Sequence, residues 1–292
     1  EYTVMTPTKA TFSGSYFFAS PGKPTQPLGF ISADIEGVAG ICSPSETNKA
    51  DPDYQEFREL MTAEVVAACE AALEAGATKV LVKDAHASAR NIIVSALPES
   101  VEIIRGWSGH PTSMMQGVDQ GMDRAIMLGY HSAASQQGNP LSHTMSGRTV
   151  HRLTVNGQVW SEFHINSMTG LYYGCPTVLV SGDTALARVV KAYDPAIETV
   201  EAFAGTGLSV QSLSPKKVQA EIRAGVTQAL QRPLDDFRAG LPEHFRLQLE
   251  YKHHSMAYER GFYPGAQQIN DNTVQFECDD YFDALRFMKF CI

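Results

Sequence analysis

Acidic and histidine side chains recur at the ends of apolar segments in the first part of this chain. Asp34 and Glu36 end the segment GFISADIEG, Asp84 and His86 end KVLVKDAH, and His131 ends DRAIMLGYH. Within each pair the residues are two positions apart, so on a continuing strand both side chains point to the same face. Burying several ionisable groups together is costly unless they are paired or bound to a cation. The pattern therefore indicates one polar site built from three segments.

These residue types suit a catalytic metal site. Imidazole nitrogens and carboxylate oxygens are ligands of Zn²⁺, and catalytic zinc sites keep one position open for water. A carboxylate can also bridge two metal ions. Bound zinc lowers the pKa of water to about 7, so a hydroxide nucleophile is available at neutral pH. No cysteine belongs to the cluster, which favours a catalytic over a structural zinc site.

Each of these residues also has an ordinary structural explanation. A single acid at a strand end often caps the next helical segment, and Asp84 suits such a role. We therefore place Asp84 beside the ligands, as a residue that supports them or orients substrate. The sequence contains no Walker loop, no HExxH, no GxSxG and no GxGxxG after a strand. Nucleotide binding and serine hydrolysis therefore lack their usual signatures.

The segments that carry the polar residues belong to an alternating series of strands and helices. We expect strands at 28–36, 79–86, 101–106, 123–131 and 176–183, and helices at 54–76, 161–173 and 183–193. Such alternation predicts an α/β fold, a mainly parallel three-layer sheet domain with helices on both faces. In such sheets ligands bind outside the carboxyl ends of the strands. The predicted fold thus brings the polar strand ends together.

The second part of the chain has a different pattern. The segment RLTVNGQVW predicts a hairpin, because polar and apolar residues alternate around Asn156-Gly157. A helix at 215–231, the strands FRLQLEY and TVQFE, and a closing helix at 279–291 predict a smaller C-terminal α+β part. We expect three regions: an irregular N-terminal extension (1–27), a catalytic metal-binding α/β domain (28–210) and a C-terminal α+β domain (211–292).

Composition narrows the class of protein. The 292 residues carry a net charge of −9 and contain no basic run, so we expect no nucleic-acid partner. No apolar stretch reaches the roughly 18 residues of a membrane span, so we expect no membrane partner. The five cysteines include no CxxC pair, which argues against a disulfide framework. We expect a cytoplasmic protein, although a chain that begins at Glu1 leaves a trimmed or processed start open.

Five dispersed blocks resemble a known family in their order and separation. The blocks are SADIEGVAGI, VLVKDAHASARN, LGYHSAAS, LSHTMSG and SEFHINSMTG, and the family is the zinc D-aminopeptidases of the DppA type. The resemblance extends over roughly 28–290 and implies a binuclear site with two zinc ions per chain. Asp34 resembles the bridging carboxylate, Glu36 and His86 resemble the other ligands of one zinc, and His131 and Glu162 resemble those of the second.

The same resemblance implies an activity and an assembly. His143, in a loop rich in Gly, Ser and Pro, resembles the catalytic histidine, and we expect Asn166 to orient substrate or a ligand. The implied reaction removes N-terminal residues, including D-amino acids, from short peptides through a metal-bound hydroxide. The implied assembly is a ring-shaped homodecamer. Two alternatives stay open: a binuclear metallohydrolase acting on another amide or a phosphate ester, and a metal-binding assembly protein without activity.

The chain departs from the family pattern in two places. Its N-terminal extension is longer than the usual family start. In the last block, Ser161 and His164 replace the glycines of the usual GELGxN. Because these larger residues are neighbours of the expected ligand Glu162, the preference for D- or L-residues stays open.

Overall fold

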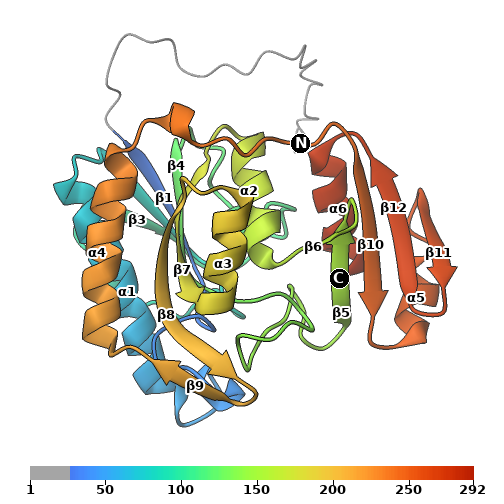
Figure 1. Ribbon diagram of the computed structural model, residues 1–292, viewed down its shortest axis with the longest axis horizontal. Helices are drawn as coiled ribbons and strands as arrows, with labels where there is room; N and C mark the ends of the chain where they lie inside the picture. The colour runs from blue at the N-terminus through green and yellow to red at the C-terminus, as the bar shows by residue number, and fades with distance from the viewer. Residues whose placement is uncertain (1–26) are drawn as a thin grey trace, which may run out of the picture.

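The computed structural model describes residues 27–292, and its centre is a seven-stranded sheet in the order β3-β2-β1-β4-β7-β8-β9 (Figure 1). The strands are β1 (Leu28–Ala33), β2 (Lys79–Asp84), β3 (Val101–Ile104), β4 (Arg124–Tyr130), β7 (Thr177–Asp183), β8 (Glu198–Thr206) and β9 (Ser209–Ser212). Neighbouring strands are parallel except for the β8–β9 hairpin. Nearly all of the expected N-terminal extension (1–27) lies outside the described residues.

Helices cover both faces of this sheet, as expected. α1 (Tyr54–Glu74) packs against α4 (Pro215–Gln231) on one face, while α2 (Glu162–Tyr172) and α3 (Thr184–Tyr193) lie on the other (Figure 1). Right-handed crossovers explain this division. The chain passes from β1 towards β2 and β3, but from β4 towards β7 and β8, which is the opposite direction along the sheet. The two series of connections therefore cross opposite faces. Between residues 27 and 292, no helix is long and apolar enough to cross a membrane.

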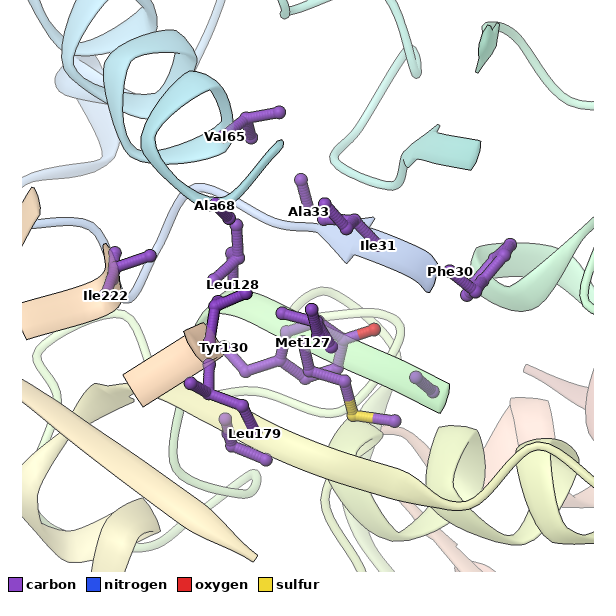
Figure 2. Packing of buried hydrophobic residues seen from close by; sticks show 14 of the residues in the cluster. Phe30, Ile31, Ala33, Val65, Ala68, Met127, Leu128, Tyr130, Leu179 and Ile222 are labelled. Carbon is purple, nitrogen blue, oxygen red and sulfur yellow. The ribbon is translucent and has the colours of Figure 1, made fainter. Parts of the chain in front are cut away.

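The core beneath α1 and α4 is apolar and closely packed. Figure 2 shows Ala68 of α1 next to Leu128 of the central strand β4, and Val65 of α1 and Ile222 of α4 belong to the same buried cluster. All four side chains are buried. The packing holds β1 and β4 in place, and the polar strand ends extend from these two strands.

Backbones meet unusually closely where β1, β4 and β7 end. A Cβ atom on Gly37 would lie 1.9 Å from the carbonyl oxygen of Tyr130, and one on Gly182 would lie 2.0 Å from the same oxygen. Only a hydrogen fits at either position. Gly129 has a φ of +66°, and the pairing of β4 with β7 shifts register between Met127 and Tyr130. The carboxyl end of β4 therefore lies tightly between the segments that follow its two neighbours.

A second, antiparallel sheet forms the other part of the molecule, in the order β11-β12-β10-β5-β6 (Figure 1). Its strands are β5 (Val150–Val155), β6 (Gln158–Val159), β10 (Phe245–Tyr251), β11 (Ala266–Asn270) and β12 (Thr273–Cys278), with helices α5 (His254–Arg260) and α6 (Tyr281–Cys291). Along β10, residues Leu247 and Leu249 are buried, whereas Arg246 is exposed. This alternation is typical of a sheet with one face on a core and one face open.

The predicted fold class is confirmed: a mainly parallel three-layer α/β part is joined to a smaller α+β part. The two sheets do not divide the chain at one point, however. The β5–β6 hairpin precedes residue 210 but pairs with β10, and α4 follows residue 210 but packs on α1. The proposed domain boundary near 210 therefore does not coincide with the division between the sheets.

Candidate active site

The polar strand ends meet at the crevice between β1 and β4. Crossovers leave these two neighbouring strands in opposite directions, which is the position where open α/β sheets bind ligands. After β1, the amide of Asp34 donates to the carbonyl oxygen of Leu128 (2.8 Å), and the amide of Gly37 donates to that of Gly129 (2.8 Å). The backbone that carries Asp34 and Glu36 is thus fixed to the end of β4.

Five side chains converge here, and we call them the ligand cluster: Asp34, Glu36, His86, His131 and Glu162. The Nδ1 atom of His86 lies 3.2 Å from Oδ1 of Asp34 and 3.0 Å from Oε2 of Glu36. The Nε2 atom of His131 lies 3.5 Å from Oδ2 of Asp34 and 3.5 Å from Oε2 of Glu162. Asp34 therefore presents one oxygen to each half of the cluster, which is the arrangement that a bridging carboxylate requires.

The ligand cluster fits a buried cation. None of its residues is more than 8% exposed. Within residues 27–292, Oε2 of Glu36 and Nε2 of His131 are buried and make no hydrogen bond, since the 3.0 Å approach of His86 to Oε2 is an ionic contact without hydrogen-bond geometry. Two sets of donor atoms each lie within 4.8 Å of one another, one on His131, His143 and Glu162 and one on Asp34, Glu36 and His131. Buried polar atoms without partners are costly, and a metal ion between them would remove that cost.

The two imidazoles are oriented by backbone carbonyls. Nε2 of His86 lies 2.9 Å from the carbonyl oxygen of Thr47, and Nδ1 of His131 lies 3.0 Å from that of Ser132. Each of these nitrogens must carry the proton, because a carbonyl oxygen only accepts. The other nitrogen of each ring faces the carboxylates, where its lone pair would be available to a bound metal ion, as is usual for histidines that bind metals.

The charges in the cluster strongly perturb one another. Burial lowers the pKa of His131, but Glu162 and Asp34 more than offset this and hold the pKa well above its usual range. Burial and the nearby charge of Glu36 raise the pKa of Asp34. Burial opposes ionisation of Glu162 too, yet His131 and His143 lower its pKa to about 2. Without a cation the site attracts protons, and metal binding would release them.

Glu162 begins α2 and is held by an unusual backbone segment. Its Oε1 atom accepts a hydrogen bond from the amide of Met145 (2.7 Å), a residue with a φ of +61°. The other oxygen is left to face His131. Sequence patterns alone did not indicate Glu162 as a ligand, because it follows a hairpin of the second sheet and does not end a strand.

His143 lies beside the ligand cluster at its more open side. Its ring stacks on that of His131, with centroids 4.3 Å apart and planes inclined by 19°. Nδ1 of His143 lies 2.9 Å from the carbonyl oxygen of Leu141, and Nε2 lies 3.5 Å from Oε1 of Glu162. The side chain is 22% exposed, against 0% for His131. His143 is therefore placed where a molecule entering the site would first meet an imidazole.

The structure places Asp84 and Asn166 further from the reacting atoms. Both oxygens of Asp84 accept hydrogen bonds from Asn91 (2.6 and 2.8 Å), and Asn91 in turn donates to the carbonyl oxygen of His86 (2.7 Å). Asp84 thus supports the loop that carries His86. Nδ2 of Asn166 donates to the hydroxyl oxygen of Tyr130 (2.9 Å). Neither contact supports direct orientation of substrate.

Asp183, at the end of β7, is a supporting residue that the sequence interpretation missed. Its carboxylate accepts from the amide and hydroxyl of Ser132 (2.7 and 2.6 Å) and from the amide of Leu186 (2.9 Å), where it caps α3. It therefore fixes the residue after His131. The sequence does carry a signal for it, because PTVLVSGD is a fourth apolar strand that ends in an ionisable residue.

Ser161 and His164, which replace the glycines of the family pattern, contact each other. Nδ1 of His164 accepts from the amide of Ser161 (3.1 Å) and lies 3.1 Å from its hydroxyl, at the start of α2. Burial lowers the pKa of His164 to about 4. A neutral imidazole therefore replaces the acid of a usual capping box beside Glu162.

Comparisons with known proteins agree with this geometry. The chain is 28% identical over 261 residues to a D-aminopeptidase of Bacillus subtilis (strain 168), covering 89% of this chain and 94% of the relative. The fold is similar to that of the Zn-dependent D-aminopeptidase DppA from Bacillus subtilis, described as a self-compartmentalizing protease. The TM-score is 0.85 and the identity 27%, over 90% of this chain and 96% of DppA. The model of peptidase family M55, D-aminopeptidase, matches residues 29–290, and this chain belongs to that family of peptidases.

Proposed function

We propose that this peptidase is a zinc-dependent aminopeptidase that removes N-terminal residues, D-amino acids among them, from short peptides. The observation that carries the proposal is the convergence of the ligand cluster at the β1–β4 crevice, where buried donor atoms on Glu36 and His131 make no hydrogen bond within residues 27–292. The family match and the zinc dependence of the structural relative support the same activity. They do not favour the phosphate-ester alternative.

Two zinc ions per chain are proposed, one held by Asp34, Glu36 and His86 and the other by Asp34, His131 and Glu162. Zinc would supply Lewis acidity, which polarises a carbonyl group and makes water acidic enough to form hydroxide at neutral pH. Asp34 directs one oxygen to each half of the cluster, which suits it to join the two positions.

His143 would hold a proton and deliver it to the leaving amine during hydrolysis. The carbonyl oxygen of Leu141 fixes its Nδ1 as the protonated nitrogen, so Nε2 faces the cluster and is available to hold or deliver a proton. A peptide bond can be broken only if the leaving amine acquires a proton, and a positioned histidine is well suited to supply it. The ligands are buried, whereas His143 is partly exposed. This arrangement suits a substrate that enters the site by one end, as the substrate of an aminopeptidase does.

The test combines metal content with hydrolysis. The purified protein should contain close to two zinc ions per chain and should release the chromophore from D-alanyl anilide, and chelation should abolish both. L-alanyl anilide and an aryl phosphate ester serve as comparison substrates. Metal content without anilide hydrolysis would remove the peptidase assignment but keep the site. Absence of metal, with no gain on adding zinc, would remove both.

We also propose a homo-oligomer, because the structural relative is described as self-compartmentalizing. A ring-shaped decamer is the specific assembly expected. Light scattering coupled to size-exclusion chromatography measures the molar mass directly. About ten times the 31.9 kDa of one chain would support the ring, and a monomer would contradict it.

A further inference from the structure

A buried asparagine connects the two halves of the site. Asn139, in the loop between His131 and His143, is 5% exposed. Its Nδ2 atom donates to the carbonyl oxygen of Glu36 (3.0 Å) and lies 3.4 Å from Oδ2 of Asp183. Its Oδ1 atom accepts from the amide of Leu141 (2.8 Å). One side-chain amide therefore ties the loop both to a metal-ligand segment and to the end of β7.

The connection continues to His143 through a single residue. Leu141 donates its amide hydrogen to Asn139, and its carbonyl oxygen accepts from Nδ1 of His143. The N–H and C=O groups of Leu141 belong to two successive peptide units, and the side chain of Asn139 holds the first of them. The second unit contains the amide of Ser142, which donates to the backbone carbonyl oxygen of Asn139 (3.2 Å). Because each peptide unit is rigid, holding both units of this turn restricts the direction of the Leu141 carbonyl. That carbonyl in turn determines which nitrogen of His143 carries the proton and where the ring points.

We propose that Asn139 is a positioning residue for catalysis: it holds Leu141 so that His143 presents Nε2 to the ligand cluster. The inference rests on the proposed function, since it gives His143 the proton-handling role. An amide is suited to the position because it accepts from Leu141 and also donates to Glu36. Aspartate would lack the donor and would place a second carboxylate beside Asp183.

The first test replaces Asn139 and measures kcat and KM separately on D-alanyl anilide. Asn139→Ala should lower kcat by roughly tenfold to a hundredfold, because small misplacements of a catalytic group have effects of that size. KM and zinc content should stay close to those of the wild type. Asn139→Ser should recover much of the loss, because a serine hydroxyl also accepts from an amide two residues on. Gln137→Ala, an exposed amide in the same loop, is the matched control.

A double-mutant cycle with His143→Ala distinguishes positioning from general damage. If Asn139 acts through His143, Asn139→Ala should cause little further loss of kcat once His143 is alanine. An equal loss in both backgrounds would overturn the proposal. So would full kcat in the single variant. Melting temperatures of all variants identify any loss that comes from unfolding.

A measurement without substrate tests the same inference independently. Amide hydrogen exchange of a peptide covering 139–145 should be faster in Asn139→Ala than in wild type, because the Leu141 amide loses its acceptor. Unchanged protection would overturn the proposal. If wild-type protein hydrolysed no anilide, the proposed function would fail, while exchange would still decide whether Asn139 holds this loop.

Discussion

Carboxylates serve two different purposes in two regions of this molecule. On the surface, Glu70 and Glu74 of α1 contact Arg223 of α4 at 2.5 and 2.7 Å. In the interior, the three carboxylates of the ligand cluster approach their imidazoles only to 3.0–3.5 Å. Arg223 contacts both surface carboxylates, whereas in the part of the chain that the structure describes two buried donor atoms of the ligand cluster make no hydrogen bond. The short contacts at the surface indicate an ion pair, whereas the 3.5 Å separations of Nε2 of His131 from Asp34 and Glu162 leave room for a cation.

The largest effect is expected from removing the carboxylate of Asp34, which both halves of the ligand cluster share. Asp34→Asn keeps the size of the side chain but removes the charge that faces both His86 and His131. We expect loss of both zinc ions and a fall of activity to background. Metal analysis and anilide hydrolysis measure the two effects, and Glu70→Gln on the surface is the control. Retention of two zinc ions would show that Asp34 is not shared.

Removing His143 should separate chemistry from metal binding. His143→Ala should reduce turnover by about two orders of magnitude or more, because a positioned proton donor contributes that much. The zinc content should not change, since the proposed ligands all remain. Steady-state kinetics and metal analysis on the same preparation give the answer. Unchanged turnover would remove His143 from the mechanism, and loss of zinc would make it a ligand.

Glu64 shows what burial does to a carboxylate that forms no ion pair within residues 27–292. It lies in α1, 1% exposed, and accepts from the amide of Ala39. Burial raises its pKa from 4.5 to about 8, although the bond from Ala39 opposes this. Between about pH 4.5 and about pH 8, Glu64 is therefore protonated in the folded state and ionised in the unfolded state.

This difference predicts a pH dependence of stability. Between about pH 4.5 and about pH 8, Glu64 should lower the free energy of unfolding by about 1 kcal/mol per pH unit as the pH rises. Glu64→Gln should remove that contribution, so its stability relative to wild type should increase towards alkaline pH and then level off. Urea unfolding across the range measures the difference. A constant difference would mean that Glu64 does not keep its proton.

The smallest effect is expected at the surface. Arg223→Ala should slightly lower the melting temperature at low salt, and the difference should shrink at high salt because exposed ion pairs are screened. Zinc content and kcat should match wild type. A change in either would show that the α1–α4 surface is coupled to the site.

The strand ends of the site could be predicted from sequence because two simple regularities coincide there. Buried parallel strands are continuous apolar runs, and parallel strands end at the same edge, so Asp34, His86 and His131 had to lie near one another. Glu162 follows the hairpin of the other sheet, and no local pattern places it there. It was found only through resemblance to a family.

Other features depend on tertiary contacts that local sequence does not encode. Asn139 sits in a loop whose composition indicates only a turn, and its partners Glu36 and Asp183 are 103 and 44 residues away. The β8–β9 hairpin, the edge strand β11 and the short helix α5 were not predicted. Their exposed faces are largely polar, so the hydrophobic pattern is weak there.

The glycines around the end of β4 also limit how this protein can be redesigned. At Gly37 and Gly182 any side chain would collide with the carbonyl oxygen of Tyr130, and the residue after Tyr130 is a proposed ligand. Libraries that vary these positions would lose the metal site before they sampled new specificities. Ser161 and His164 also lie beside Glu162, and there this chain already carries larger side chains than the family pattern. Directed evolution of substrate preference should therefore randomise the start of α2 and leave the strand ends fixed.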